Sequence, residues 1–252
     1  MSDEAVTYGN WVSAKLVAFP GAVGGLFAAA ALFVPWLGIL AGGFLLISGY
    51  FAYARRVFSP RGRDVQDRMV GLGLSRLPAA DWEGIVLDVG CGSGALAVRI
   101  AKRCPGARIV GIDRWGPGWE SSEQRCQQNA RIEGVADRIS FVSGDAASLP
   151  FDDDSFDAVV SNFVFHEVHG ARDKRTLLQE ALRVLKPGGV FVFQDLFLWR
   201  RVYGPIDELL AEIRGWGLAR AEFVDTSRSP FVPRALKLPF MLGTAGILYG
   251  RK

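Results

Sequence analysis

A glycine-rich segment is the clearest chemical feature of the chain. It reads Asp-Val-Gly-Cys-Gly-Ser-Gly over residues 88–94 and directly follows the apolar run 85–87. Glycine is needed where the backbone turns sharply and where a ligand must approach it closely. A loop of this kind between a strand and a helix is where an open α/β sheet binds a nucleotide-like ligand. The segment therefore predicts a nucleotide-type site.

The glycines alone leave two ligands open. Gly90, Gly92 and Ala95 also satisfy the dinucleotide pattern G-x-G-x-x-G/A. Asp88, which precedes the loop, favours another ligand, because its carboxylate suits a cationic amino-acid group and would repel a pyrophosphate. Asp145 points the same way, since a carboxylate after the third expected strand can accept a hydrogen bond from an adenine amino group.

A further acid, Asp113, ends the second expected strand. A carboxylate at that position can bind ribose hydroxyls, and dinucleotide sites place an acid there too. Asp113 therefore predicts a ribose without separating the two ligands.

The only two histidines, His166 and His169, both follow the fourth expected strand, with Glu167 between them. The pKa of histidine suits proton removal near neutral pH, so His166 is the candidate general base. Alternatively, His166 and Glu167 shape the pocket or cap the next helix. We expect no metal site here, because nothing nearby supplies further ligands.

Short apolar runs alternate with amphipathic stretches through this part of the chain. We expect strands at 85–89, 108–112, 139–142, 156–161, 190–194, 221–226 and 245–249, and helices at 60–77, 95–103, 119–133, 173–185 and 205–216. The first of these helices would begin at Ser59-Pro60, with serine as the cap. The alternation predicts an α/β fold with a parallel, doubly wound sheet.

Five motifs occur in order along residues 64–226. They are Val86–Gly94, Gly111-Ile112-Asp113, Gly144-Asp145-Ala146, Phe156-Asp157-Ala158-Val159 and Leu185-Lys186-Pro187-Gly188-Gly189. Together they resemble class I S-adenosylmethionine-dependent methyltransferases, most of all the small-molecule branch with the ubiquinone and menaquinone C-methyltransferases. The resemblance implies S-adenosylmethionine as cofactor, S-adenosylhomocysteine as product, and a Rossmann-like seven-stranded sheet whose last strand, near 244–250, is antiparallel.

The resemblance also implies a cofactor-binding set. Its members are, for the loop around the methionine portion, Asp88, Gly90, Cys91, Gly92 and Gly94; for the ribose, Asp113; for the adenine, Arg114, Trp115, Asp145 and Ala146; and for the transferring methyl group, Asn162. Trp115 could instead be a packing residue of its loop. His166, Glu167 and Asn162 are the expected catalytic residues.

The N-terminal region has a different character. Residues 16–54 contain no Asp, Glu, Lys, Arg or His. As one helix they would be about 58 Å long, roughly twice the hydrocarbon thickness of a bilayer. Two transmembrane spans, at about 16–34 and 37–54 with a turn at Pro35-Trp36, fit better. The alternatives are a hairpin in one leaflet, a single span, a soluble helical pair and a signal peptide.

These features predict two domains, a membrane anchor at 1–55 and a methyltransferase domain at 56–252. Six arginines within 55–76 place the methyltransferase domain in the cytoplasm by the positive-inside rule. Glycines four apart, at 21 and 25 and at 38 and 42, permit close helix packing and homo-oligomers. The three cysteines, an odd number without metal-ligand spacing, are expected to be free thiols.

The acceptor is expected to be a small molecule. The anchor and the basic, apolar segment 228–243 favour a hydrophobic or membrane-resident acceptor, such as a lipid amine, a quinone precursor or a thiol. A small soluble acceptor and a non-catalytic cofactor-binding scaffold are the alternatives. Nucleic acid is not expected, because no Asn/Asp-Pro-Pro-aromatic motif follows the fourth strand and the net charge is only +3.

Overall fold

The computed structural model describes residues 5–77, 82–116 and 121–252. They form two compact units. One is Gly9–Met69, and the other is Val70–Lys252 together with the segment before Gly9.

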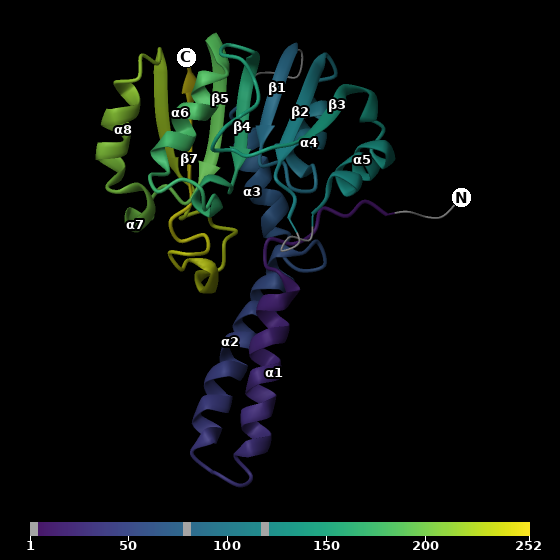
Figure 1. Cartoon of the computed structure of the whole chain (residues 1–252), viewed down its shortest axis with the longest axis vertical. Helices are drawn as coiled ribbons and strands as arrows, with labels where there is room; N and C mark the ends of the chain where they lie inside the picture. Colours follow the sequence, from purple (N-terminus) through teal and green to yellow (C-terminus); the bar gives the residue numbers. More distant parts are fainter. Residues whose placement is uncertain (1–4, 78–81, 117–120) are drawn as a thin grey trace. The chain divides into compact units, whose positions relative to one another are not determined.

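The first unit contains two antiparallel helices, α1 (Ala14–Ala30) and α2 (Leu37–Phe58), which run side by side (Figure 1). Two helices are thus present where two spans were expected, and the turn between them, over residues 31–36, includes Pro35-Trp36. That they form a transmembrane hairpin stays a prediction. Of the helices in the described residues, only α2 is long and apolar enough to cross a membrane by length and composition. Helix α1 is apolar as well, but it has 17 residues.

Small residues bring these two helices together, although not at the spacing that we expected. A Cβ atom on Gly24 would lie 2.9 Å from Cγ of Leu45, and one on Gly21 would lie 3.0 Å from Oγ of Ser48. Nothing lies within 4 Å of the corresponding position on Gly25. The close approach therefore uses Gly21 and Gly24. The Ser48 hydroxyl adds a hydrogen bond of 2.8 Å to the carbonyl of Val17.

The expected helix start at Ser59-Pro60 was wrong. Helix α3 spans Val65–Leu74, and the residues before it form turns. The Ser59 hydroxyl donates back to the carbonyl of Arg56 at 2.8 Å, so it completes the end of α2 instead of capping the next helix. Asp64, with φ of 51°, then redirects the chain into α3.

The second unit is built on a seven-stranded sheet in the order β3-β2-β1-β4-β5-β7-β6. The strands are β1 (Gly84–Val89), β2 (Ala107–Asp113), β3 (Ile139–Ser143), β4 (Phe156–Asn162), β5 (Leu185–Asp195), β6 (Arg220–Asp225) and β7 (Gly246–Arg251). Only β7 pairs antiparallel with its neighbours. The predicted doubly wound sheet with an antiparallel last strand is confirmed.

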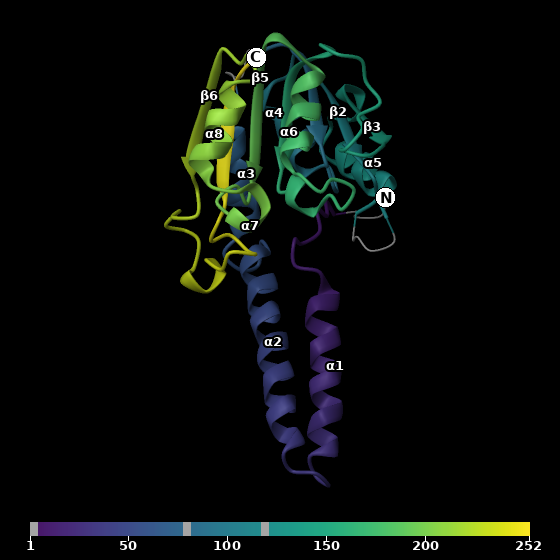
Figure 2. The same ribbon diagram turned by 60° about the vertical axis from the view of Figure 1, so that its left-hand side comes forward.

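Helices cover both faces of this sheet (Figures 1 and 2). They are α4 (Ala95–Arg103), α5 (Glu123–Ile132), α6 (Arg175–Arg183), α7 (Arg200–Tyr203) and α8 (Ile206–Arg214). Neighbouring side chains of β1 show the layering, because Val86 belongs to the core cluster that includes α4, and Leu87 belongs to the one that includes α6 and α8. Both faces are buried, which is why the strands read as continuous apolar runs.

One expected boundary differs from the structure, and another lies outside the described residues. Strand β5 begins at Leu185, which pairs with Phe156 of β4. The register then shifts, and regular pairing resumes where Val190 pairs with Ala158. The Pro-Gly-Gly motif, expected to close the preceding helix, lies within this strand. The other boundary, a helix start at Trp119, lies outside the described residues, and α5 is described from Glu123.

Candidate functional site

The glycine loop lies at the point where the order of the sheet reverses. Strand β1 pairs with β2 on one side and β4 on the other, so Val89 has Ile112 and Ser161 as neighbours. The loop then crosses to the N-terminus of α4. Ligands of open α/β sheets bind outside the carboxyl ends of the strands at such a reversal.

All three glycines of the loop have positive φ, at 74° for Gly90, 57° for Gly92 and 81° for Gly94. A Cβ atom on Gly90 would lie 2.2 Å from Val164, and one on Gly94 would lie 3.3 Å from Phe141. A Cβ atom on Gly92 would meet nothing within 4 Å. Gly90 and Gly94 are therefore constrained by the protein, whereas Gly92 leaves its backbone open to a ligand.

Asp113 and Trp115 fix the backbone of Gly92. The Gly92 N–H donates to Oδ2 of Asp113 at 2.8 Å, and the indole Nε1 of Trp115 donates to the Gly92 carbonyl at 2.8 Å. Oδ1 of Asp113 accepts the Trp115 N–H at 3.1 Å. A carboxylate has about four acceptor sites, so Asp113 keeps capacity for ribose hydroxyls. Through its hydrogen bond to Gly92, the Trp115 side chain has a structural role in its loop. Such a role was the alternative to adenine binding.

Asp88 is buried next to this loop, with 1% of its surface exposed. Its Oδ2 atom has no hydrogen-bond partner among the described residues. Burial raises the pKa of Asp88 to about 7; the backbone N–H of Ala97 opposes the rise, and the charge of Asp113 adds to it. An unpartnered buried carboxylate oxygen is costly, so this atom fits a cationic group of a ligand.

The residues expected around the adenine lie beyond the ends of β2 and β3. Arg114 and Asp145 form an ion pair of 3.8 Å between exposed side chains. The other oxygen of Asp145 accepts the Ala147 N–H at 2.8 Å, while Ala146 is partly buried against the core. Exposed ion pairs contribute little stability, so a ligand can displace this one at small cost.

Cys91 and Cys126, near the loop, are buried, as is Cys104, and none of these three described residues forms a disulfide. The Cys126 thiol donates to the Gly92 carbonyl at 3.0 Å. A hydrogen bond with Cys126 and burial raise the pKa of the Cys91 thiol. Since the thiolate is the reactive form, Cys91 is a structural residue of the loop.

His166 lies in the short 3-10 helix η2 (Phe165–Glu167), directly beyond β4. Its Nδ1 atom is 2.7 Å from Oδ1 of Asp195, which is fully buried at the end of β5. Its Nε2 atom is 3.7 Å from Oε1 of Glu167. The histidine and glutamate singled out in the sequence are thus adjacent, and Asp195, which was not predicted, joins them.

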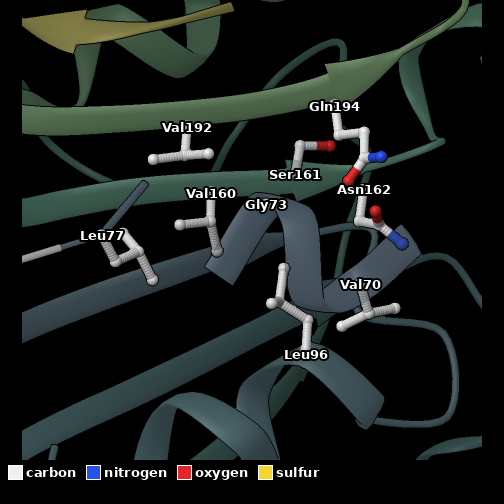
Figure 3. A pocket seen from close by; sticks show the side chains of 9 residues that line it. All are labelled: Val70, Gly73, Leu77, Leu96, Val160, Ser161, Asn162, Val192 and Gln194. Atoms are coloured by element: carbon white, nitrogen blue, oxygen red, sulfur yellow. The ribbon is translucent and has the colours of Figure 1, made fainter. Parts of the chain in front are cut away.

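Asn162 is the last residue of β4 and lines a small pocket with an apolar floor (Figure 3). Its neighbour in the sheet is Gln194, which was also not predicted. Gln194 is 1% exposed, and among the described residues neither of its amide atoms has a hydrogen-bond partner; the same holds for Oδ1 of Asn162. The rest of the lining consists of Val70, Gly73, Leu77, Leu96, Val160, Ser161 and Val192.

Within the described part of the chain, no group of three or more His, Cys, Asp or Glu residues is arranged to hold a metal ion. His169 does not join His166 and Glu167 in such a group.

Comparison with known proteins identifies this region. Residues 87–193 match the family model described as a methyltransferase domain. This stretch of the chain is therefore similar to a methyltransferase domain. The matched residues run from the end of β1 to β5, so they include the glycine loop, Asp113 and His166.

Two curated relatives show how far the similarity extends. The ubiquinone/menaquinone biosynthesis C-methyltransferase of Paracoccus denitrificans is 41% identical over 104 residues, which cover 41% of this chain and 39% of the relative. The arsenite methyltransferase of Aquipseudomonas alcaligenes is 32% identical over 190 residues, which cover 70% of this chain and 52% of the relative. The chain thus spans about half or less of these relatives.

A solved structure supports the fold. Geranyl diphosphate C-methyltransferase from Streptomyces coelicolor, solved with S-adenosyl-L-homocysteine, aligns with a TM-score of 0.57 and 17% identity. The alignment covers 75% of this chain and 79% of that chain. At this identity the likeness shows a shared fold alone.

Proposed function

We propose that this chain is a membrane-anchored methyltransferase that transfers a methyl group from S-adenosylmethionine to a small, hydrophobic acceptor. The observation that carries the proposal is the loop at Gly92. There an open backbone, the Asp113 carboxylate and the unpartnered oxygen of Asp88 lie together at the sheet reversal. When bound, S-adenosylmethionine supplies a methyl group that is already activated by its sulfonium.

The residues of the loop fit this cofactor by their chemistry. Asp88 would take the cationic amino group, the segment 90–94 would follow the methionine portion, and Asp113 would hold the ribose hydroxyls. For the adenine we propose Arg114, Trp115, Asp145 and Ala146. Such contacts hold the methyl donor at a fixed place, and fixed geometry supplies much of the acceleration in a transfer of this kind.

The acceptor side would be formed by the ends of β4 and β5. Asn162 would face the methyl group, and His166, with Glu167 beside it, would remove a proton from the acceptor where the chemistry requires it. The His166 side chain is only 15% exposed, and the exclusion of water around it strengthens each polar contact that it makes.

We further propose that residues 1–55 anchor the chain as an integral membrane protein and that 56–252 form the catalytic domain in the cytoplasm. The support is the apolar surface of α1 and α2, where Phe19, Leu26, Ile39 and Leu46 are all more than two-thirds exposed. A surface of this kind is rare on soluble proteins and suits lipid. The open faces at Gly25 and Gly42 would permit pairing of these helices between chains.

The cysteines of the chain favour a hydrophobic acceptor over a soft inorganic acceptor such as arsenite. The name of the Aquipseudomonas relative suggests arsenite as a second candidate. Soft metalloid centres bind to thiolates. All three cysteines of this chain are buried, and the Cys126 thiol is engaged with Gly92. A quinone precursor, lipid amine or alkyl thiol needs no protein thiolate.

The test is methyl transfer from labelled S-adenosylmethionine by the full chain in detergent micelles or proteoliposomes. Total lipid extract and the soluble metabolites of the same cells serve as separate acceptor pools. We expect label in the lipid extract, and Asp113→Ala should remove most of it by weakening cofactor binding. Asp137→Ala, at an exposed site in the short 3-10 helix η1 (Ala136–Arg138), is the matched control. Label confined to the soluble pool would contradict the hydrophobic acceptor, and no label in either pool would contradict methyl transfer.

A further inference from the structure

We infer that Asp195 is a positioning residue that engages Nδ1 of His166, so that Nε2, on the side of Glu167, is the nitrogen that acts as general base. It follows that the acceptor is a molecule whose attacking atom carries a proton, such as a hydroxyl, an ammonium group or a thiol. This inference rests on the proposed methyltransferase function and deepens it.

The sheet brings the two residues together. Asn162 and Gln194 pair at the ends of β4 and β5, so the chain segments that follow them leave the sheet side by side. His166 comes four residues after Asn162, and Asp195 directly follows Gln194. The Nδ1 atom of His166 and Oδ1 of Asp195 are 2.7 Å apart, within the range of a charge-assisted hydrogen bond.

The partners of Asp195 determine which histidine nitrogen carries the proton. The Leu196 N–H donates to Oδ1 at 2.6 Å, and the His166 backbone N–H donates to Oδ2 at 3.3 Å. A carboxylate can only accept hydrogen bonds. The Nδ1 atom of His166 must therefore donate, and in the neutral ring the Nε2 atom then carries a lone pair.

The charges around the ring make it a stronger base. Burial lowers the pKa of His166 and Lys174 lowers it further, but the charge and hydrogen bond of Asp195, with the charge of Glu167, raise it more. Burial raises the pKa of Glu167, and the charges of Asp195 and Asp113 add to this while His166 and His169 oppose it. Tyr203, buried near Asp195, also has a raised pKa. The result is a ring that binds a proton more firmly than free histidine does.

The proton transfer balances without any other reactant. The attacking atom of the acceptor gives its proton to Nε2 of His166 and uses an electron pair to bond the methyl carbon. The carbon–sulfur electron pair stays on sulfur. One positive charge leaves sulfur and one appears on the imidazole, where Asp195 stabilises it.

The obvious alternative is that the pair only ties the end of β5 to the loop after β4. In that case the tautomer of the ring has no consequence for the acceptor. Spectroscopy can establish the tautomer, because the chain has only two histidines, and the kcat of Asp195→Asn separates the two cases. No acceptor needs to be known for the measurement of the tautomer.

The experiment uses the full chain in detergent micelles, labelled with ¹⁵N only in histidine, with His169→Gln to assign the signals. We expect neutral His166 to be protonated at Nδ1, and its pKa to fall in Asp195→Asn. Asp152→Asn, an exposed carboxylate outside the site, should change neither. A proton on Nε2 in the unmodified chain, or an unchanged pKa in Asp195→Asn, would overturn the inference. If Asp195→Asn does not fold, the tautomer in the unmodified chain still decides.

Activity supplies an independent check. With an acceptor pool that the chain methylates, Asp195→Asn should lower kcat by a factor of about 10² or more while the KM for S-adenosylmethionine stays close to that of the unmodified chain. The acidic limb of the pH–rate profile should move to lower pH, following the pKa of His166. A higher KM for S-adenosylmethionine with an unchanged kcat would make Asp195 a structural residue. If Asp195→Asn still binds S-adenosylhomocysteine, such a result contradicts the role of Asp195 and leaves the methyltransferase proposal standing.

Discussion

Two glycines of the same loop are constrained in different ways, and substitution can separate them. Both have positive φ, which costs an alanine about 1–2 kcal/mol. At Gly90 a methyl group would also collide with Val164, whereas at Gly92 it would point into open space. Gly90 is therefore required for folding, whereas Gly92 is required for a ligand to approach the backbone of the loop.

We therefore expect Gly90→Ala to lower the thermal unfolding midpoint markedly. Gly92→Ala should lower the midpoint less, yet weaken binding of S-adenosylhomocysteine by about tenfold or more, because its methyl group occupies the approach to the backbone. Circular dichroism and calorimetric titration measure the two effects. Equal binding by Gly92→Ala and the unmodified chain would show that no ligand contacts this backbone.

Asp88 predicts a pH dependence of stability. Its pKa rises from 3.8 in the unfolded chain to about 7 in the folded one. Below pH 3.8 both states are protonated and Asp88 has no effect. Between pH 3.8 and about 7 the folded state holds the extra proton, so its stability relative to the unfolded chain falls as pH rises. The total change is on the order of 2–4 kcal/mol.

In Asp88→Asn this contribution is absent. We expect unfolding curves recorded from pH 4 to pH 8 to lose stability less steeply in the variant than in the unmodified chain. The two proteins are compared by how much the free energy of unfolding changes from one pH to the next. Its absolute value is not compared, because the buried asparagine amide has a cost of its own. Parallel curves for the two proteins would mean that Asp88 is ionised throughout the range.

At the scale of elements, helix α5 carries a buried amide that connects three segments. The Nδ2 atom of Asn129 donates to the carbonyls of Thr7 and Ser93, each at 2.9 Å, and its Oδ1 atom accepts the Thr7 N–H at 3.0 Å. Ser93 belongs to the glycine loop. The contact therefore links that loop to the segment before Gly9.

Removing this amide should affect both stability and binding. We expect Asn129→Ala to destabilise the fold by about 1–3 kcal/mol, since buried backbone groups lose their partners, and to weaken S-adenosylhomocysteine binding because Ser93 is released. Gln128→Ala, exposed on the same helix, is the matched control. Loss of stability with unaltered binding would show that the loop does not depend on α5.

Elements whose signal is local were predictable from the sequence. The strands are apolar because helices cover both faces, and the glycine loop is marked by its own residues. Asp195 and Gln194 were missed because their significance comes from pairing between β4 and β5, across 29 residues in the case of His166 and Asp195. The helix start at Ser59 was wrong for a related reason, since a serine cap and a serine that closes the preceding helix have the same local sequence.

At the scale of the whole molecule, the apolar helices predict how the chain partitions in a cell. We expect the full chain to remain in the membrane pellet after carbonate extraction. Leu46→Arg, at an exposed position of α2, should shift part of it to the supernatant, because a central arginine costs about 2.5–3.5 kcal/mol on insertion. Leu46→Phe should behave like the unmodified chain. Release of the unmodified chain would remove the membrane anchor from the proposed function.

The buried carboxyl of Asp88 also has a consequence for ligand binding. With a pKa of about 7, this group is roughly half protonated at neutral pH. A cationic ligand that pairs with it must expel that proton, so occupancy of the site is linked to acidity. We expect such a ligand to bind less tightly as the pH falls below about 7 and to regain its affinity when neutral pH returns.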